Sequence, residues 1–197
     1  MTTEPASAPL LHGSSGDVVL VEVLVLRLDD HGRLAYRVVD EYAHARSPDT
    51  VAIEAAGVPT VREPVGTVSH STSWRYDGGQ IVLTYAVAPD PQPHLTATPL
   101  LHVGIVCSND PLHPTPGVLH QHHVAAHAVR HLAYLASTDP TVAKAASQQP
   151  DLWHALTHYA AATTVGAHDQ THHSTPDRRH CLTRLRGVPR LRRPGDR

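Results

Sequence analysis

The N-terminal half of the chain carries the residue pattern of β-strands. Residues 18–28 read VVLVEVLVLRL, an almost continuous apolar and β-branched run interrupted only by Glu22 and Arg27. Such a run is typical of a central strand covered on both faces. A DDHG turn follows at 29–32, and residues 34–42 are predicted to return as a second strand. Residues 43–64 contain Pro48, Gly57 and Pro59 and are predicted to be loop.

The strongest hairpin signal lies at residues 67–87, where DGG at 77–79 separates two strand-like runs. A two-residue turn within DGG pairs even positions of the first strand with odd positions of the second. The first strand then has a core face and a polar face that is open to water or to a ligand. The predicted core face holds His70, Thr72 and Trp74, and the polar face holds Ser71, Ser73 and Arg75.

The C-terminal half changes from strand to helix signals. Residues 100–107 are expected to form one more strand. Thr115-Pro116, Asp139-Pro140 and Pro150 are typical helix starts, and Gly166 would end the last helix. Strands followed by helices, without alternation, predict an α+β fold: an antiparallel meandering sheet followed by two or three helices packed on one face. We expect a flexible N-terminus at 1–15, one domain at 16–166 and a disordered basic tail at 167–197.

Charge is divided unevenly along the chain. Residues 178–197 contain eight arginines and one acid, Asp196, for a charge of +7, whereas residues 1–177 contain eight basic and 17 acidic residues, for −9. A basic segment can neutralise nucleic-acid phosphates. This one has no aromatic residue to stack on bases, and the acidic body would repel the backbone. Nucleic-acid binding is therefore not expected.

Targeting signals are not evident. No stretch approaches the roughly 20 apolar residues of a membrane-spanning helix, and residues 1–15 lack the basic and apolar regions of a signal peptide. We therefore expect a cytoplasmic protein without a membrane partner. Cys107 and Cys181 have no metal-ligand spacing and are expected to be free thiols.

Histidine is the unusual residue, with 18 in the chain. Residues 119–135 read LHQHHVAAHAVRHLAYL. On a helical wheel of about 100° per residue, His120, His123, His127 and His131 fall opposite the apolar face. Imidazoles four residues apart can chelate one divalent metal, although three successive turns cannot all reach the same ion. A single site would combine one such pair with a ligand from elsewhere.

His154 and His158 form a second pair with this spacing, so the candidate metal ligands are His120, His123, His127, His154 and His158. A zinc, manganese or iron ion there could activate water for hydrolysis. The sequence supplies no HExxH motif and no evident general base beside the stripe. A solvated histidine-rich face that reflects composition, or a proton-sensitive interaction surface, are the alternative interpretations.

Three further features are candidates for ligand contacts. Ser71, Ser73 and Arg75 could form an anion or carbonyl pocket, or an ordinary polar face. Arg130 and His131 could hold an anion or form a solvated edge. Glu22, isolated in an apolar strand, is expected to pair with an arginine of a neighbouring strand, or else to be functional.

Two regions resemble other proteins. HSTSWRY at 70–76 with the following DGG, and AVRHLAYLASTDP at 128–140, are similar to segments of small proteins without established activity from high-GC actinobacteria. The resemblance implies a bacterial, cytoplasmic protein and draws attention to Trp74, Arg75, Arg130 and His131. It implies no catalytic role.

The functional prediction is a binding or interaction protein without catalysis. Its partner would be a small molecule or another protein, held by the polar hairpin face and the outward face of the first long helix. The competing hypothesis is a metal-dependent hydrolase built on the histidine stripe. Whether the protein is an oligomer is left open.

Overall fold

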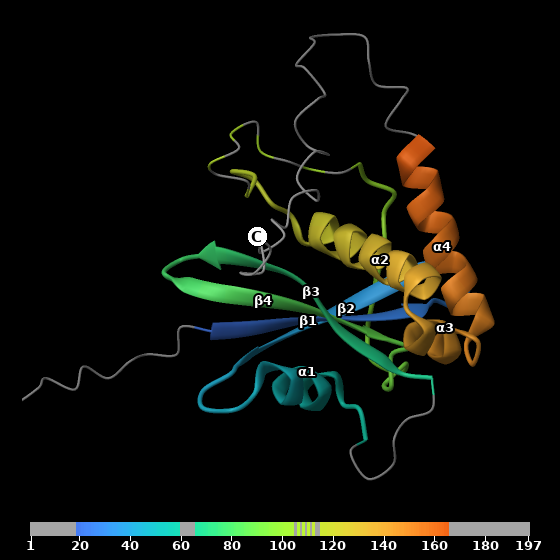
Figure 1. The fold of residues 1–197 in the computed structure, drawn as a ribbon, viewed down its shortest axis with the longest axis horizontal. Helices are drawn as coiled ribbons and strands as arrows, with labels where there is room; N and C mark the ends of the chain where they lie inside the picture. Colours follow the sequence, from blue (N-terminus) through green and yellow to red (C-terminus); the bar gives the residue numbers. More distant parts are fainter. Residues whose placement is uncertain are drawn as a thin grey trace, which may run out of the picture.

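The computed structural model describes residues 19–59, 66–104, 106, 108, 110, 112 and 115–165. Within them, one helix covers one face of a five-stranded sheet and three helices cover the other (Figure 1). The elements in chain order are β1 (Val19–Leu28), β2 (Leu34–Tyr42), α1 (Pro48–Ala56), β3 (Val68–Asp77), β4 (Gln80–Ala88), β5 (Thr98–Pro99), α2 (Gln121–Thr138), α3 (Pro140–Ala146) and α4 (Pro150–Val165). The predicted α+β class is confirmed.

The sheet is mixed rather than an antiparallel meander. Its order is β3-β4-β1-β2-β5, and β4 runs parallel to β1 while the other neighbours are antiparallel. The prediction of a wholly antiparallel sheet is therefore wrong. After β2 the chain crosses one face as α1, which contacts all four long strands. It then enters the far edge as β3, so that β4 returns beside β1.

α1 lies in the segment that was expected to be loop. Pro48 occupies its first turn, and Gly57 ends it with a φ of 79°, the left-handed conformation that glycine adopts without strain. The residues that suggested a loop are thus the boundaries of a short helix. Its buried side chains, Val51, Ala52 and Ala56, cover a face that was expected to have no helix. Helices therefore pack on both faces, not on one.

β1 is the centre of the core. Leu24 and Leu26 belong to the cluster formed with α2, α3 and α4, whereas Val21, Val23 and Val25 belong to the cluster formed with α1. All five side chains are fully buried. The prediction of a central strand covered on both faces is confirmed, and strand alternation assigns every other residue to the helix α2 side.

The C-terminal helices begin partly where predicted. α3 and α4 start at Pro140 and Pro150, and the carboxylate of Asp139 accepts hydrogen bonds from the first turn of α3. α2 starts at Gln121 rather than after Pro116, because residues 115–120 form bends, in which Val118 is 66% and Leu119 37% exposed. The bent segment lies across a cleft from the end of the β3–β4 hairpin.

The expected strand at 100–107 is not present among its described residues: β5 ends at Pro99, and the N–H of Leu100 still donates to the carbonyl of Leu34 before the regular pairing with β2 ends. None of the described helices combines the length and apolar character needed to cross a bilayer. The predicted N-terminal segment 1–15, the tail 167–197, Gly166, Cys107 and Cys181 lie outside the described residues.

Candidate functional site

The β3–β4 hairpin has the predicted turn but a different register beyond its middle. Gly78 and Gly79 form the two-residue turn with φ of 56° and 91°, so Asp77 pairs with Gln80 and Arg75 with Val82, as predicted. A β-bulge then lies between residues 71 and 73, after which Ser71 pairs with Tyr85. Because a bulge shifts the alternation by one residue, the strand changes faces at this point.

The bulge divides the predicted polar face. Ser73 pairs with Thr84 and shares the α2 side of the sheet with Arg75, whereas Ser71 pairs with Tyr85 and lies on the α1 side. His70 pairs with Ala86 and faces the helices rather than following Trp74. The prediction that Ser71, Ser73 and Arg75 form one face is therefore wrong for Ser71.

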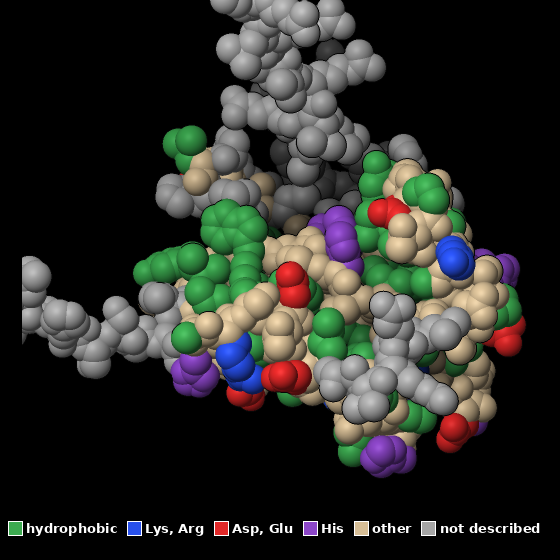
Figure 2. All heavy atoms as spheres, turned by 60° about the horizontal axis from the view of Figure 1, so that its bottom comes forward, with side chains coloured by type: hydrophobic (Ala, Val, Ile, Leu, Met, Phe, Trp, Pro, Cys, Tyr) green, Lys and Arg blue, Asp and Glu red, His purple; other side chains and the backbone are tan. Residues whose placement is uncertain are grey.

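Trp74 is not the core anchor that the sequence predicted. Its side chain is 70% exposed, and Tyr76 beside it is 68% exposed. Both stand on the α1 side of the hairpin, beyond the part of the sheet that α1 covers. Figure 2 shows hydrophobic side chains gathered at this end of the molecule. Ile81, which pairs with Tyr76 across the hairpin, is 38% exposed.

Arg75 forms an ion pair with Glu22 on the α2 side of the sheet. Its two terminal nitrogens donate to the two carboxylate oxygens at 3.0 and 2.9 Å, and the hydroxyl of Thr84 donates to Oε2 at 3.1 Å. Glu22 is 5% exposed and Thr84 is fully buried. Glu22 pairs with an arginine, as expected, but Arg75 belongs to β3 and not to a strand next to β1. The neighbouring strand β4 contributes Thr84 as an additional partner.

The surroundings of this ion pair carry an excess of negative charge. Asp40 is opposite Glu22 in the β1–β2 register and therefore lies on the same face. Burial and the charge of Glu22 raise the pKa of Asp40, while Arg75 opposes this shift. Hydrogen bonding to Glu22, together with the charges of Asp77 and Asp40, raises the pKa of Arg75 against the effect of burial. The charges of three carboxylates thus act on one guanidinium.

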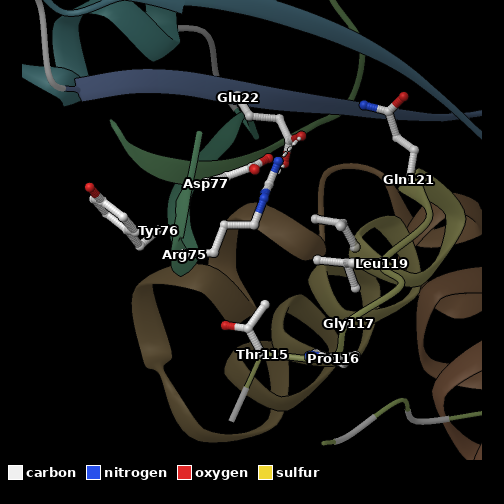
Figure 3. Close-up of a pocket in the computed structure, with 10 residues that line it drawn as sticks. Glu22, Arg75, Tyr76, Asp77, Thr115, Pro116, Gly117, Leu119 and Gln121 are labelled. Carbon is white, nitrogen blue, oxygen red and sulfur yellow. Dashed lines mark hydrogen bonds and ion pairs between the residues drawn. The ribbon is translucent and has the colours of Figure 1, made fainter. Parts of the chain in front are cut away.

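A cleft of about 540 Å³ opens over this cluster. One wall is the hairpin end with Arg75, Tyr76 and Asp77, and Glu22 is at the floor. The opposite wall is the bent segment before α2 and the first turns of that helix, contributed by Thr115, Pro116, Gly117, Leu119, Gln121 and Val124. In Figure 3 the carboxylates of Glu22 and Asp77 lie together at the head of Arg75, across the cleft from Leu119. The site therefore combines a charged side with an apolar one.

The predicted histidine stripe of α2 does not lie on one solvated side. His127 is exposed, and its Nε2 lies 3.4 Å from the carbonyl oxygen of Thr72 at the bulge. His131 is half-buried and stacks on His70, with ring centroids 5.2 Å apart. Burial lowers the pKa of His131, and the charges of His70 and His127 lower it further. The prediction that His131 faces away from the core is wrong, because the edge strand β3 lies under it.

At the start of α2, three imidazoles gather instead. The ring centroids of His120, His122 and His123 are 4.2–5.5 Å apart, and His123 accepts a hydrogen bond from the backbone N–H of His120. Burial and the charges of the other two rings lower the pKa of His123. These contacts cap the helix end.

The structure does not assemble the predicted metal ligands. His154 and His158 contact each other on α4 with ring centroids 6.4 Å apart. Across residues 19–59, 66–104, 115–165 and the single described positions between them, no group of three or more His, Cys, Asp or Glu side chains is placed to hold a metal ion. The metal-dependent hydrolase therefore gains no support from the described part of the chain.

Arg130 and His131, predicted as a joint anion site, turn to different neighbours. The Arg130 guanidinium donates to the carbonyl of Val103 and lies over the Tyr159 ring, 5.9 Å from its centroid. Burial lowers the pKa of Arg130. Tyr159 in turn donates to the carbonyl of Leu101 at 2.6 Å. Arg130 thus ties residues 101–103 to α2 and α4, and neither Arg130 nor His131 lines the cleft.

Sequence reasoning missed part of the cleft. Asp40 and Asp77 were treated as the end of a strand and a turn, and Gln121 as part of a histidine-rich helix. The available signal was Glu22 itself, because a carboxylate in the middle of an apolar central strand requires a counter-charge or hydrogen-bond donors. Asp40 follows from the β1–β2 register, whereas the approach of the β3–β4 hairpin depends on the parallel β1–β4 pairing, which the sequence did not reveal.

The fold and the cleft together define the class: an α+β protein with a ligand-sized cleft over a buried ion pair. No protein-family model, curated protein or solved structure matches the chain. The candidate function is therefore argued from the cleft alone.

Proposed function

We propose that the protein binds a small cationic ligand, an amine or a guanidinium with a short aliphatic part, in the cleft between the β3–β4 hairpin and the start of α2. The proposal keeps the predicted class, a binding protein without catalysis, and moves the site. Of the predicted ligand contacts, only Arg75 lines the cleft.

The observation that carries this proposal is the buried ion pair at the floor of the cleft. Removing two charges from water costs several kcal/mol per ion, and an apolar pair of similar volume is often as stable or more stable. Glu22 is nevertheless placed in the most buried strand of the core, 5% exposed, at a point where a cleft reaches that strand. Ligand binding would explain why a charged side chain is buried at this position, whereas a contribution to stability would not.

Charge and volume indicate the ligand class. Glu22, Asp40 and Asp77 exceed Arg75 by two negative charges, so the cleft attracts cations. Leu119 and Val124 offer an apolar surface to a short alkyl chain. The volume of about 540 Å³ falls within the range of roughly 300–1,000 Å³ that is usual for small-molecule sites.

The test is a titration of the full chain with butylguanidinium and with butylurea, its neutral isostere, followed by the amide NMR signals of Asp77 and Gln121. With about eight non-hydrogen atoms at about 0.5 kcal/mol each, the cation is expected to bind with a dissociation constant on the order of 1 mM. Butylurea should bind at least tenfold more weakly. Equal binding of the two probes, or no shift of these signals by either, would contradict the proposal.

A matched pair of variants adds specificity. Asp77→Asn removes a carboxylate from the cleft, and Asp30→Asn removes one from the exposed β1–β2 turn. Asp77 ends β3 next to its turn and Asp30 lies in a turn, and both changes keep the size of the side chain. Only Asp77→Asn should weaken the binding of butylguanidinium, by about threefold to tenfold, because one charge at a partly solvated site contributes about 1 kcal/mol. An equal effect of Asp30→Asn would indicate non-specific attraction to the acidic body.

A further inference from the structure

We infer that the arginine-rich segment of this same chain, residues 178–197, occupies the cleft and is its built-in cationic ligand. The inference rests on the proposed function of the cleft and names the source of the cation. The segment lies outside the described residues, and the argument uses only its sequence and the surface that it would meet.

The charges of the two parts are complementary. Residues 178–197 carry +7 and the rest of the chain carries −9. Within the described residues, the cleft brings this negative charge to a defined place: Glu22 and Asp77 line it, and Asp40 acts on the same ion pair. An acidic cleft and an arginine-rich segment on one chain attract each other before any other cation is added.

The chemistry of the cleft suits guanidinium groups in particular. Arg75 already shows the geometry, because its fork donates to both oxygens of Glu22 at 2.9 and 3.0 Å. Asp77 presents a second carboxylate beside it (Figure 3). A second guanidinium could bind that carboxylate in the same bidentate manner.

The length of the chain permits this contact. The last described residue is Val165, and 12 residues separate it from Arg178. Extended chain spans up to about 3.5 Å per residue, so these 12 reach about 40 Å. A domain of this size has a radius of gyration of about 15 Å, so the arginines can reach the cleft from α4. Because the segment is tethered, its effective concentration is on the order of millimolar, and weak ion pairs are sufficient for docking.

The test uses the native thiol inside the segment. In the full chain with Cys107→Ser, a neutral nitroxide label on Cys181 lies between Arg179 and Arg184. We expect the label to broaden the amide NMR signals of residues 76–79 and 117–121 at low salt, more than those of the β1–β2 turn at 29–32. The broadening should disappear in about 0.5 M NaCl, because salt screens exposed charges, and in a variant with all eight arginines changed to glutamine.

Three results would overturn the inference. The cleft signals could be no broader than those of the 29–32 turn, the broadening could persist in the arginine-to-glutamine variant, or it could come from another molecule. A mixture of labelled unenriched protein and unlabelled ¹⁵N protein distinguishes the last case. Broadening in the mixture as strong as in the single sample would show that the segment docks on a second copy rather than on its own chain.

Butylguanidinium separates this inference from the proposed function. If the segment occupies the cleft, the probe should bind the arginine-to-glutamine variant about twofold to tenfold more tightly than the native chain, because the altered segment no longer competes with the probe for the cleft. Equal affinity for both chains without broadening would refute docking and leave the proposed function standing. Broadening without any binding of the probe would refute the small-ligand function and leave docking standing. Absence of both would refute both.

Discussion

The Glu22–Arg75 ion pair supports a quantitative prediction about stability. Changing Glu22 to glutamine keeps the shape but removes the charge that accepts two hydrogen bonds from Arg75 and one from Thr84. The side chains of Glu22 and Arg75 are 7% and 18% exposed, so the pair is only partly screened by water. Breaking a buried pair costs about 3–5 kcal/mol. We expect a cost at the lower end of this range, about 3 kcal/mol, because Arg75 in the variant is still partly exposed to water and still interacts with the charges of Asp40 and Asp77.

The assay is a double-mutant cycle with Glu22→Gln and Arg75→Met, measured by urea denaturation at neutral pH. Each single variant should lose about 2–3 kcal/mol of unfolding free energy, and the double variant should lose much less than the sum. The interaction energy should be about 2 kcal/mol. For a chain of this length, a loss of 3 kcal/mol lowers Tm by roughly 6–12 °C. An interaction energy below about 0.5 kcal/mol would refute the argument that the two side chains stabilise each other.

One further variant separates stability from function. The triple change Glu22→Leu, Arg75→Met and Thr84→Val replaces the polar cluster by apolar side chains of similar volume. Its unfolding free energy should return to within about 1 kcal/mol of the native value, since buried ion pairs are often replaceable. Butylguanidinium should bind this variant more weakly, because the Glu22 carboxylate is lost while Asp40 and Asp77 keep the cleft negative. An affinity equal to that of the native chain would show that Glu22 takes no part in binding the cation.

Two other predictions concern the fold. Burial holds the pKa of His131 below its ordinary value of 6.5, so the native state resists protonation there; its contribution to stability is complete above about pH 6.5 and is lost as the pH falls. His131→Phe should therefore reduce the loss of unfolding free energy between about pH 7 and pH 5. Urea denaturation at the two pH values measures this loss, and an equal loss in the variant and the native chain would contradict the prediction. Gly66→Ala should cost about 1–3 kcal/mol, because φ is 86° and the added Cβ would lie 2.8 Å from the Cβ of Gln148. Gly78→Ala, with φ of 56° and no neighbour within 4 Å, should cost only about 1 kcal/mol, and thermal unfolding of the two variants compares them directly.

Some of the fold was predictable because its signals are local. The apolar run of β1, the DGG turn and the prolines that start α3 and α4 each act within a few residues. The partner of Glu22 was predictable as a class, because a buried charge requires a counter-charge. Its identity was not, since Arg75 is 53 residues away and meets Glu22 only through the parallel pairing of β1 with β4.

The errors have a common cause in tertiary context. Trp74 was assigned to the core from its size, but α1 is too short to cover the hairpin end. Ser71 was assigned to the face of Arg75 by alternation, which the bulge at Thr72 reverses. His131 was assigned to solvent by the helical wheel of α2 alone, which contains no information about where β3 passes. In each case the residue was assigned from local information alone, such as its size, the alternation of a strand or the wheel of one helix, and the packing of another element changed the outcome.

The bulge at Thr72 also affects how the protein avoids self-association. β3 is an edge strand of ten residues, and a straight edge of that length presents unpaired backbone groups on which another chain can add a strand. The bulge breaks the edge near its middle, and there the carbonyl oxygen of Thr72 already faces Nε2 of His127. The same irregularity that moves Ser71 away from the cleft therefore leaves only short straight stretches of β3, which protects an otherwise open sheet from edge-to-edge aggregation.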